Sequence, residues 1–580
     1  MSTKSILVAI TVVSACAIDP AVAGDPLSFQ AAALSGQTAP GTAGRVFSFF
    51  YPPSIGNSGR VVFPGWLTGV TSNDEGLWSG LPGSLQLVAR EGSAAPGTTG
   101  VFGQNSWTSP VCVNSSGVVA FSASLTGPGI VGTNNLGIWA GLQGAVSLVA
   151  RSGNAAPGTS AGVVFAGALQ NWLMLNDAGQ LLFRGALSGS GVDASNDFGF
   201  WVGTPGALQL VAREGDAAPG TSGVFGPFNG PFVDPPVPVM NATGQVVFSA
   251  NSTAGRGIWR WTAGTLELVA LTGASAIGIS NVVFEVLHEP WMNASGQVVF
   301  LASLAGENVD ATNNRGIWAG VPGAVGLVVR KGSPAPGTSG QYLGMNADNV
   351  GLNSIDDGGF VTLGCSLFDS NWAVVPGGGG VWRYGIGGGG TAYTVHTDPA
   401  PGLSGINMGG SNSWGPHPTS SLPFQTYLTG TGVNGGNDDS LWLKDAGHSP
   451  LLIVRDGDSF DIGGGVMRTI GTIVTSPGTN RQSGYNANRQ MVIGLGFVGG
   501  TSGIFTANIP VPAMPGDMNC DQAVNGQDIA AFALAVLDPA TYAARFSGCP
   551  ILNGDSNQDN ITNAGDSESF VACVLAGGCP

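Results

Sequence analysis

The sequence predicts an all-β fold made from eight copies of one four-stranded unit, followed by a small α-helical module. An aromatic residue recurs in one short strand at intervals of roughly 60 residues, which indicates a supersecondary unit copied along the chain. The eight positions are Trp78, Trp139, Trp201, Trp259, Trp318, Trp382, Trp442 and Phe505. The 96 Gly and 36 Pro among 580 residues, with only 9% charged residues, indicate many turns between short strands and few helices.

Residues 1–23 carry the pattern of a secretory signal peptide. Lys4 precedes an apolar run over residues 6–13, and Ala21-Val22-Ala23 offers a small-residue cleavage site. We therefore expect an exported protein, secreted or held at the cell surface or in the periplasm. A second interpretation stays open, because residues 13–16 resemble a bacterial lipobox in which Cys16 becomes the lipidated first residue. No later stretch of about 18 apolar residues predicts a transmembrane helix.

Charge excludes two classes of partner. The chain has 19 Lys and Arg against 35 Asp and Glu, a net charge of −16. Nucleic acids and anionic membrane surfaces are bound by clustered basic residues, so neither is expected here.

Each predicted unit begins with an Asn-x-x-Gly turn and an apolar strand. The turns are headed by Asn57, Asn114, Asn176, Asn241 and Asn293, with Asn353 and Asn486 heading later copies that lose the fourth-position glycine. A Gly-Ile-Trp strand, a Leu-Val-Ala-Arg strand, an Ala-Pro-Gly corner and a Val-Phe strand follow. Four strands in each unit of roughly 60 residues predict the blades of a β-propeller over residues 24–508.

The two ends of this region are out of phase with the repeat. Residues 31–47 look like the second half of a unit, and residues 486–510 like the first half of another. We expect each terminus to give two strands to one shared blade, which closes the ring and leaves no free sheet edge.

Recurrence also guides the interpretation of single residues, because a catalytic centre is unique whereas structural positions repeat. We expect the repeated Trp to form the blade core and the strand arginines to make blade-to-blade contacts. These arginines are Arg90, Arg151, Arg213, Arg330 and Arg455. The Asn-rich loops before the tryptophans are expected to be Asx turns, with a sugar- or cation-binding rim as the alternative. The four histidines form no catalytic motif, and no catalytic residue is predicted.

The repeat pattern, seen in residues 114–121, resembles the bacterial tandem-repeat proteins that are named for this motif and grouped by their C-terminal anchors, the choice-of-anchor type. The resemblance covers residues 28–510 and implies an exported repeat protein without known catalytic residues.

A Pro-rich linker at residues 509–515 leads to a duplicated module at residues 516–580. Oxygen-bearing residues at positions 1, 3, 5, 9 and 12 of a twelve-residue loop, with a carbonyl at position 7, are typical of an EF-hand calcium site. The pair resembles a dockerin, which implies two Ca²⁺ ions. The implied ligands are Asp517, Asn519, Asp521, Ala523, Asn525 and Asp528 in one loop, and Asp555, Asn557, Asp559, Ile561, Asn563 and Asp566 in the other. Gly526-Gln527 and Ala564-Gly565 replace the Ser-Thr pair that cohesins read, which speaks against a cohesin partner.

Apolar residues after each loop predict a helix with one buried face. The matched pairs are Phe532 and Phe570, Val536 and Val574, and Leu537 and Leu575. Cys520, Cys549, Cys573 and Cys579 are expected to form disulfides, with all three pairings open. Cys112 and Cys365 are expected to be buried thiols.

The sequence thus favours an exported, non-enzymatic β-propeller that binds a cell-surface protein or polysaccharide and carries a calcium-binding docking module. The alternative is a polysaccharide-degrading lyase or hydrolase with a dockerin, because two carboxylates far apart in sequence suffice for that chemistry.

Overall fold

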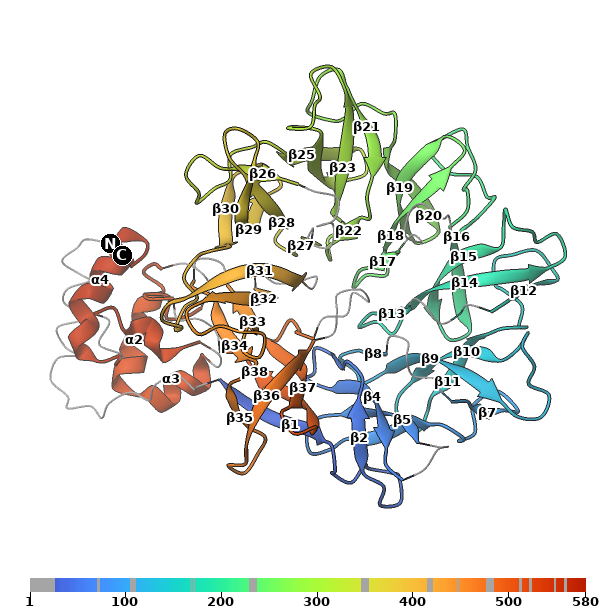
Figure 1. Cartoon of the computed structure of the whole chain (residues 1–580), viewed down its shortest axis with the longest axis horizontal. Coiled ribbons are helices and arrows are strands. Elements are labelled where there is room, and N and C mark those ends of the chain that lie inside the picture. Colours follow the sequence, from blue (N-terminus) through green and yellow to red (C-terminus); the bar gives the residue numbers. More distant parts are fainter. Residues whose placement is uncertain are drawn as a thin grey trace. The chain divides into compact units, whose positions relative to one another are not determined.

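The computed structural model forms an eight-bladed β-propeller and a small helical module (Figure 1). It describes residues 27–69, 74–104, 111–167, 169, 173–228, 237–345, 354–414, 421–445, 448–475, 484–510, 514–520, 524–546, 549–557 and 561–579. By contacts the chain divides into Gln30–Thr506, the ring, and a second unit made of Met1–Phe29 and Ala507–Pro580.

Eight antiparallel sheets make up the ring. Blade 1 contains β2 (Phe47–Phe50), β3 (Ser54–Ile55), β4 (Val61–Leu67), β5 (Glu75–Gly80) and β6 (Gln86–Arg90). Blade 2 contains β7 (Val101–Phe102), β8 (Cys112–Val113), β9 (Val119–Thr126), β10 (Leu136–Gly141) and β11 (Ser147–Arg151). Blade 3 contains β12 (Val163–Phe165), β13 (Leu173–Leu175), β14 (Leu181–Gly189), β15 (Phe198–Thr204) and β16 (Ala207–Arg213). Blade 4 contains β17 (Val239–Met240), β18 (Val246–Ser252), β19 (Gly255–Thr262) and β20 (Thr265–Leu271).

The other four blades follow the same order. Blade 5 contains β21 (Val282–Leu287), β22 (Trp291–Met292), β23 (Val298–Gly306), β24 (Arg315–Val321) and β25 (Ala324–Arg330). Blade 6 contains β26 (Tyr342–Gly344), β27 (Ser354–Ile355), β28 (Phe360–Phe368), β29 (Val374–Gly385) and β30 (Gly390–Val395). Blade 7 contains β31 (Ile406–Trp414), β32 (Leu422–Gly430), β33 (Asp439–Lys444) and β34 (Leu451–Arg455). Blade 8 contains β1 (Ser28–Leu34), β35 (Ser459–Asp461), β36 (Met467–Val474), β37 (Gln490–Phe497) and β38 (Ser502–Asn508).

The repeated tryptophans are buried in the blades and join neighbouring blades. Trp139 in β10 has no exposed surface, and its indole Nε1–H donates to the Pro96 carbonyl at 2.9 Å. Pro96 belongs to the Ala-Pro-Gly corner that leaves blade 1 and enters blade 2. A Cβ on the next residue, Gly97, would lie 3.0 Å from the Leu148 Cβ of β11. The corner therefore packs on the face of the following blade, and the core assignment of the tryptophans is confirmed.

Four of the five strand arginines donate to the loop before a strand of their own blade, so the predicted blade-to-blade contact is wrong for them. These four are Arg151, Arg213, Arg330 and Arg455. Arg151 pairs with Gly137 across the sheet, which places its side chain beside the loop before β10. There its Nε donates to the Asn134 carbonyl at 2.8 Å. The Asn134 side chain accepts from Val131 N and donates to Gly129 O, so it bends this loop through residues that precede it and not through the bond to residue i+2 that defines the predicted Asx turn.

Both termini build blade 8, but not as two strands each. The sheet order is β1-β38-β37-β36-β35, so the N-terminus supplies one strand. Ser35 N donates to Ser502 O at 2.9 Å, and Ser502 N donates to Ser35 Oγ at 2.9 Å. Phe47, expected in this blade, starts β2 in blade 1 instead. The predicted two-plus-two seam is wrong because the chain has already crossed to the next blade once it passes the Ala-Pro-Gly corner.

Residues 516–579 form three helices and two 3-10 turns around a small core. They are α2 (Asp528–Leu537), α3 (Pro539–Arg545), η4 (Ile551–Gly554), η5 (Ala564–Asp566) and α4 (Ser567–Ala576). The Phe532 and Phe570 rings stack with centroids 4.0 Å apart. Leu537 and Leu575 are 53% and 57% exposed, so their predicted place on the buried face is wrong. Each leucine lies five residues after the phenylalanine of its helix, and at 3.6 residues per turn this spacing places the two side chains on different faces.

The cysteines of the helical module form two disulfides, Cys520–Cys549 and Cys573–Cys579. Cys112 and Cys365 are buried free thiols, as predicted. Among the described residues, no helix is long and apolar enough to span a membrane.

Replacing Trp139 by Ala should lower the free energy of unfolding of the ring by about 3–5 kcal/mol, because it removes a fully buried ring and the bond to the corner. Urea denaturation measures the change. The matched control is Leu142→Ala, where the side chain is 50% exposed and a change within about 0.5 kcal/mol is expected. Equal effects of the two variants would contradict the core role.

A chain that begins at Ser35 lacks β1 and leaves the edge of β38 unpaired. We expect a lower melting temperature and aggregation, because an open sheet edge pairs with other molecules. A chain that begins at Leu27 is the control and should behave as the mature protein. Light scattering and thermal melting measure both, and identical curves would show that blade 8 is stable without its N-terminal strand.

Candidate functional site

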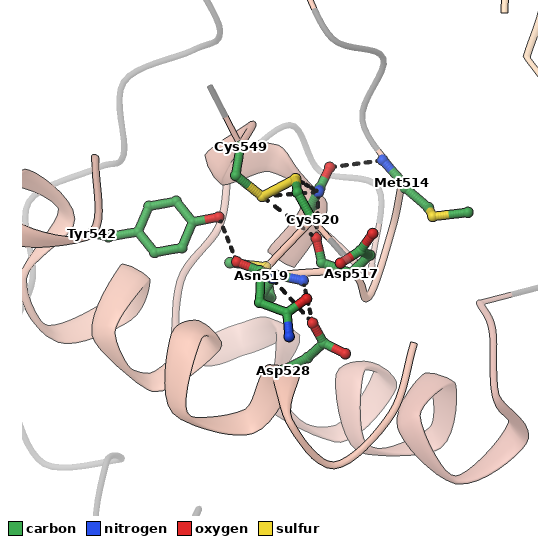
Figure 2. Close-up of a disulfide and its surroundings, with 9 residues drawn as sticks. Met514, Asp517, Asn519, Cys520, Asp528, Tyr542 and Cys549 are labelled. Atoms are coloured by element: carbon green, nitrogen blue, oxygen red, sulfur yellow. Dashed lines mark hydrogen bonds between the residues drawn. A yellow bond between two sulfur atoms is a disulfide. The ribbon is translucent and has the colours of Figure 1, made fainter. Parts of the chain in front are cut away.

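The first C-terminal loop is closed by the carboxylate at its twelfth position. Asp528 opens α2 and is fully buried. Its Oδ1 accepts hydrogen bonds from Met518 N at 2.8 Å and Asn519 N at 3.1 Å, while Oδ2 accepts from Asn525 N at 2.9 Å. Figure 2 shows Asp528 and Asn519 side by side, with Asp517 nearby. The last residue of the loop therefore holds its second, third and ninth positions together.

The second loop repeats this arrangement. Asp566 is fully buried, and its Oδ1 accepts from Ser556 N at 2.9 Å and Asn557 N at 3.1 Å. Its Oδ2 accepts from Asn563 N at 2.9 Å. Burial raises the pKa of Asp566, and the neighbouring Asp555 carboxylate acts in the same direction. The sequence duplication is thus a duplication of geometry.

Nine of the twelve predicted ligand residues are described, and Asp521, Ala523 and Asp559 lie outside the described residues. In each loop the described carboxylates are the first and twelfth residues. No cluster of three or more His, Cys, Asp or Glu occurs in the part of the chain that the structure describes. The described candidates offer carboxylate, amide and carbonyl oxygens, which are the ligands that a hard cation such as Ca²⁺ takes. Asp517 is only 2% exposed and lies in the same loop as Asp528.

Two residues that the sequence did not single out position the first loop. The buried Asn553 side chain donates to the Asp517 carbonyl and accepts from Met514 N at 2.7 Å. The Tyr542 hydroxyl donates to Met518 O at 3.0 Å (Figure 2). Neither lies in the duplicated motif, so only the tertiary structure reveals them.

A second candidate site is a cavity at the centre of the ring, toward which the Asn-x-x-Gly turns converge (Figure 1). Its volume is about 280 Å³. Turns of seven blades line it, together with apolar side chains that include Met174, Met240 and Trp291. The sequence predicted these turns but gave no sign that they meet around one cavity.

The turns are joined to one another by their first asparagine. Asn114 Nδ2 donates to Asn176 O at 3.1 Å, and Asn241 Nδ2 donates to Asn293 O at 3.1 Å. Across the seam, Asn486 Nδ2 donates to Gly56 O at 2.8 Å. The side chain thus caps the neighbouring blade as well as its own turn.

Two turns differ from the sequence assignment. Gly56, not Asn57, holds the first position in blade 1, and Asp356 holds it in blade 6 with Gly359 fourth. The predicted start at Asn353 lies outside the described residues. Gly56 is needed because a Cβ there would lie 2.8 Å from Asn114 O.

In blade 8, Arg489 occupies the glycine position with φ +58°. Its guanidinium makes two bonds to Asp445 at 2.8 and 2.9 Å. This ion pair joins blade 8 to blade 7, and offsets the unfavourable left-handed backbone.

Gly56→Ala should lower the free energy of unfolding by about 1–3 kcal/mol, because the new methyl group forces blades 1 and 2 apart. Gly167→Ala is the control, since no atom lies within 4 Å of a Cβ there, and its effect should stay within about 1 kcal/mol. Urea denaturation measures both. If the two variants match, the contact of Gly56 with blade 2 does not constrain the ring.

Comparison with known proteins gives a family. The sequence profile of a family of unknown function (DUF7453) matches residues 23–370 and 379–515. No curated protein matches the chain. Solved structures that resemble it include the β-propeller domain of the Trilobed protease from Pyrococcus furiosus, at 9% identity and a TM-score of 0.32 over 71% of this chain and 99% of that one. Another is Oligopeptidase B from Leishmania major, at 10% identity and a TM-score of 0.37 over 78% of this chain and 54% of that one.

Proposed function

Because the chain belongs to a family of unknown function (DUF7453), we propose its function from the geometry: an exported binding protein whose C-terminal module docks in a calcium-dependent way. In this proposal the propeller presents the binding surface for a cell-surface protein or polysaccharide. Residues 516–580 form a dockerin-like module with one Ca²⁺ in each loop. Cleavage after Ala23, or lipidation at Cys16, accompanies export.

The observation that carries the proposal is the identical closure of the two loops by Asp528 and Asp566. Each brings the second, third and ninth positions around one buried carboxylate. Burying carboxylates together is unfavourable without a positive charge. A Ca²⁺ ion in each loop supplies that charge and accepts Asn side-chain and backbone oxygens as further ligands.

The compartment and the ring agree with this proposal. Two disulfides in the helical module are consistent with an extracellular or periplasmic protein.

Within the described lining of the central cavity, the charged side chains are Asp177 and Asp357. Asp177 accepts from Ser115 N and Asn57 Nδ2, and Asp357 accepts from Ala294 N, so both carboxylates serve neighbouring turns. Binding suits such a cavity better than the polysaccharide cleavage that the sequence leaves as the alternative, which needs a proton donor and a nucleophile or base.

Calorimetry of the full chain should detect two Ca²⁺ ions, and chelation should lower the melting temperature of the helical module, because metal binding contributes folding free energy. The variant with Asp517→Ala and Asp528→Ala should bind one ion. Asp538→Ala is the matched control: this carboxylate caps α3 by accepting from Thr541 N at 3.0 Å, and both sites should remain. Absence of calcium binding at about 1 mM would contradict the proposal.

A further inference from the structure

One joint between blades departs from the rest of the ring. In six blades the tryptophan indole donates to the second residue of the preceding corner, as Trp139 does to Pro96. In blade 7, Trp442 Nε1 donates instead to Ser440 Oγ of its own strand, at 2.8 Å. A Cβ on Gly402 in this corner would meet no atom within 4 Å, whereas at Gly97 it would touch Leu148. Gly402 therefore lies farther from the face of blade 7 than Gly97 does from blade 2, while Ala400 stays buried in the core cluster that contains Trp442.

A cavity of about 370 Å³ lies beside this corner. Pro401 of the corner lines it together with Tyr393 of β30, Met408 of β31 and Lys444 at the end of β33. His448 also lines it, and the exposed Asp398 borders it. All these residues belong to blades 6 and 7 and the segments that join or follow them.

Lys444 is the unusual member of this lining. It stands two residues after the blade tryptophan, where blades 1, 2, 3 and 5 have a glycine with positive φ. Its side chain is almost completely buried, at 9% relative exposure. Nζ donates to the His448 carbonyl and lies 5.9 Å from the centroid of the Tyr393 ring. Burial lowers the pKa of this ammonium group, while Asp445 and Asp398 act in the opposite direction.

No carboxylate among the described residues forms an ion pair with Lys444. An ammonium group has three donors, and one carbonyl uses only one of them. A buried charge of this kind is unfavourable unless an anion pairs with it. The cavity next to Nζ provides room for such an anion.

We propose that this cavity binds a small hydroxylated carboxylate, such as a sugar acid, through a salt bridge to Lys444. The apolar surfaces of Tyr393, Pro401 and Met408 contact the carbon skeleton of the ligand. The carboxylate of Asp398, at the border of the cavity, repels a second carboxylate on the ligand, so a monocarboxylate is favoured. The same group accepts hydrogen bonds from the hydroxyl groups of the ligand. The site is independent of the calcium loops and of the central cavity.

Competitive labelling of lysine amines by acetic anhydride, followed by mass spectrometry, tests the proposal on the unmodified protein. Lys444 and Lys331 are the lysines of the described region, so Lys331 is an internal control. D-glucuronate and acetate at about 10 mM should slow the labelling of Lys444 roughly fivefold, because the carboxylate covers the amine and keeps it protonated. The labelling of Lys331 should not change, and D-glucose should have no effect.

Two variants complete the test. Lys444→Met keeps the length of the side chain without its charge and should abolish the rise in melting temperature caused by D-glucuronate. Asp398→Asn should retain that rise. The proposal is overturned if neither carboxylate slows labelling of Lys444, if D-glucose slows it equally, or if Lys444→Met still responds to D-glucuronate.

Discussion

In six of the eight blades, the contact between the blade tryptophan and the preceding corner joins the blade to its neighbour. Each blade is a separate sheet, without backbone ladder hydrogen bonds to the next blade. Adjacent blades must therefore be joined through side chains and connecting segments. The corner combines a buried Ala, a carbonyl that accepts the indole N–H, and a Gly that lets the backbone approach a leucine, as Gly97 does with Leu148. The recurrence of these residues follows from this one joint.

A second set of contacts joins the inner ends of the blades. Asparagines such as Asn114 and Asn241 satisfy their own turn and donate to the next one. Where the asparagine is missing, another interaction takes its place, as the Arg489–Asp445 ion pair does between blades 7 and 8. The outer joint thus depends on packing, while the inner ring depends on hydrogen bonds.

The sequence predicted the number of blades and the buried tryptophans, because these depend on local patterns that repeat. It misplaced the strand that contains Phe47, since a linear repeat does not show where the chain passes from one blade to the next. It paired Asn57 with the wrong turn position, because the close approach of Gly56 to Asn114 O exists only in three dimensions. The cavity beside Lys444 could not be predicted from the sequence, because it lies beside a corner that keeps the Ala-Pro-Gly motif but does not accept the indole hydrogen bond of Trp442, which goes to Ser440 instead.

The single N-terminal strand in blade 8 also determines when the ring can form. Ser35 bonds to Ser502, a partner 467 residues further along the chain. During biosynthesis the first strand to emerge must therefore wait, unpaired, until almost the whole ring has been made. Seven blades can assemble one after another from neighbouring segments, but the last depends on a contact with a very large loop-closure entropy.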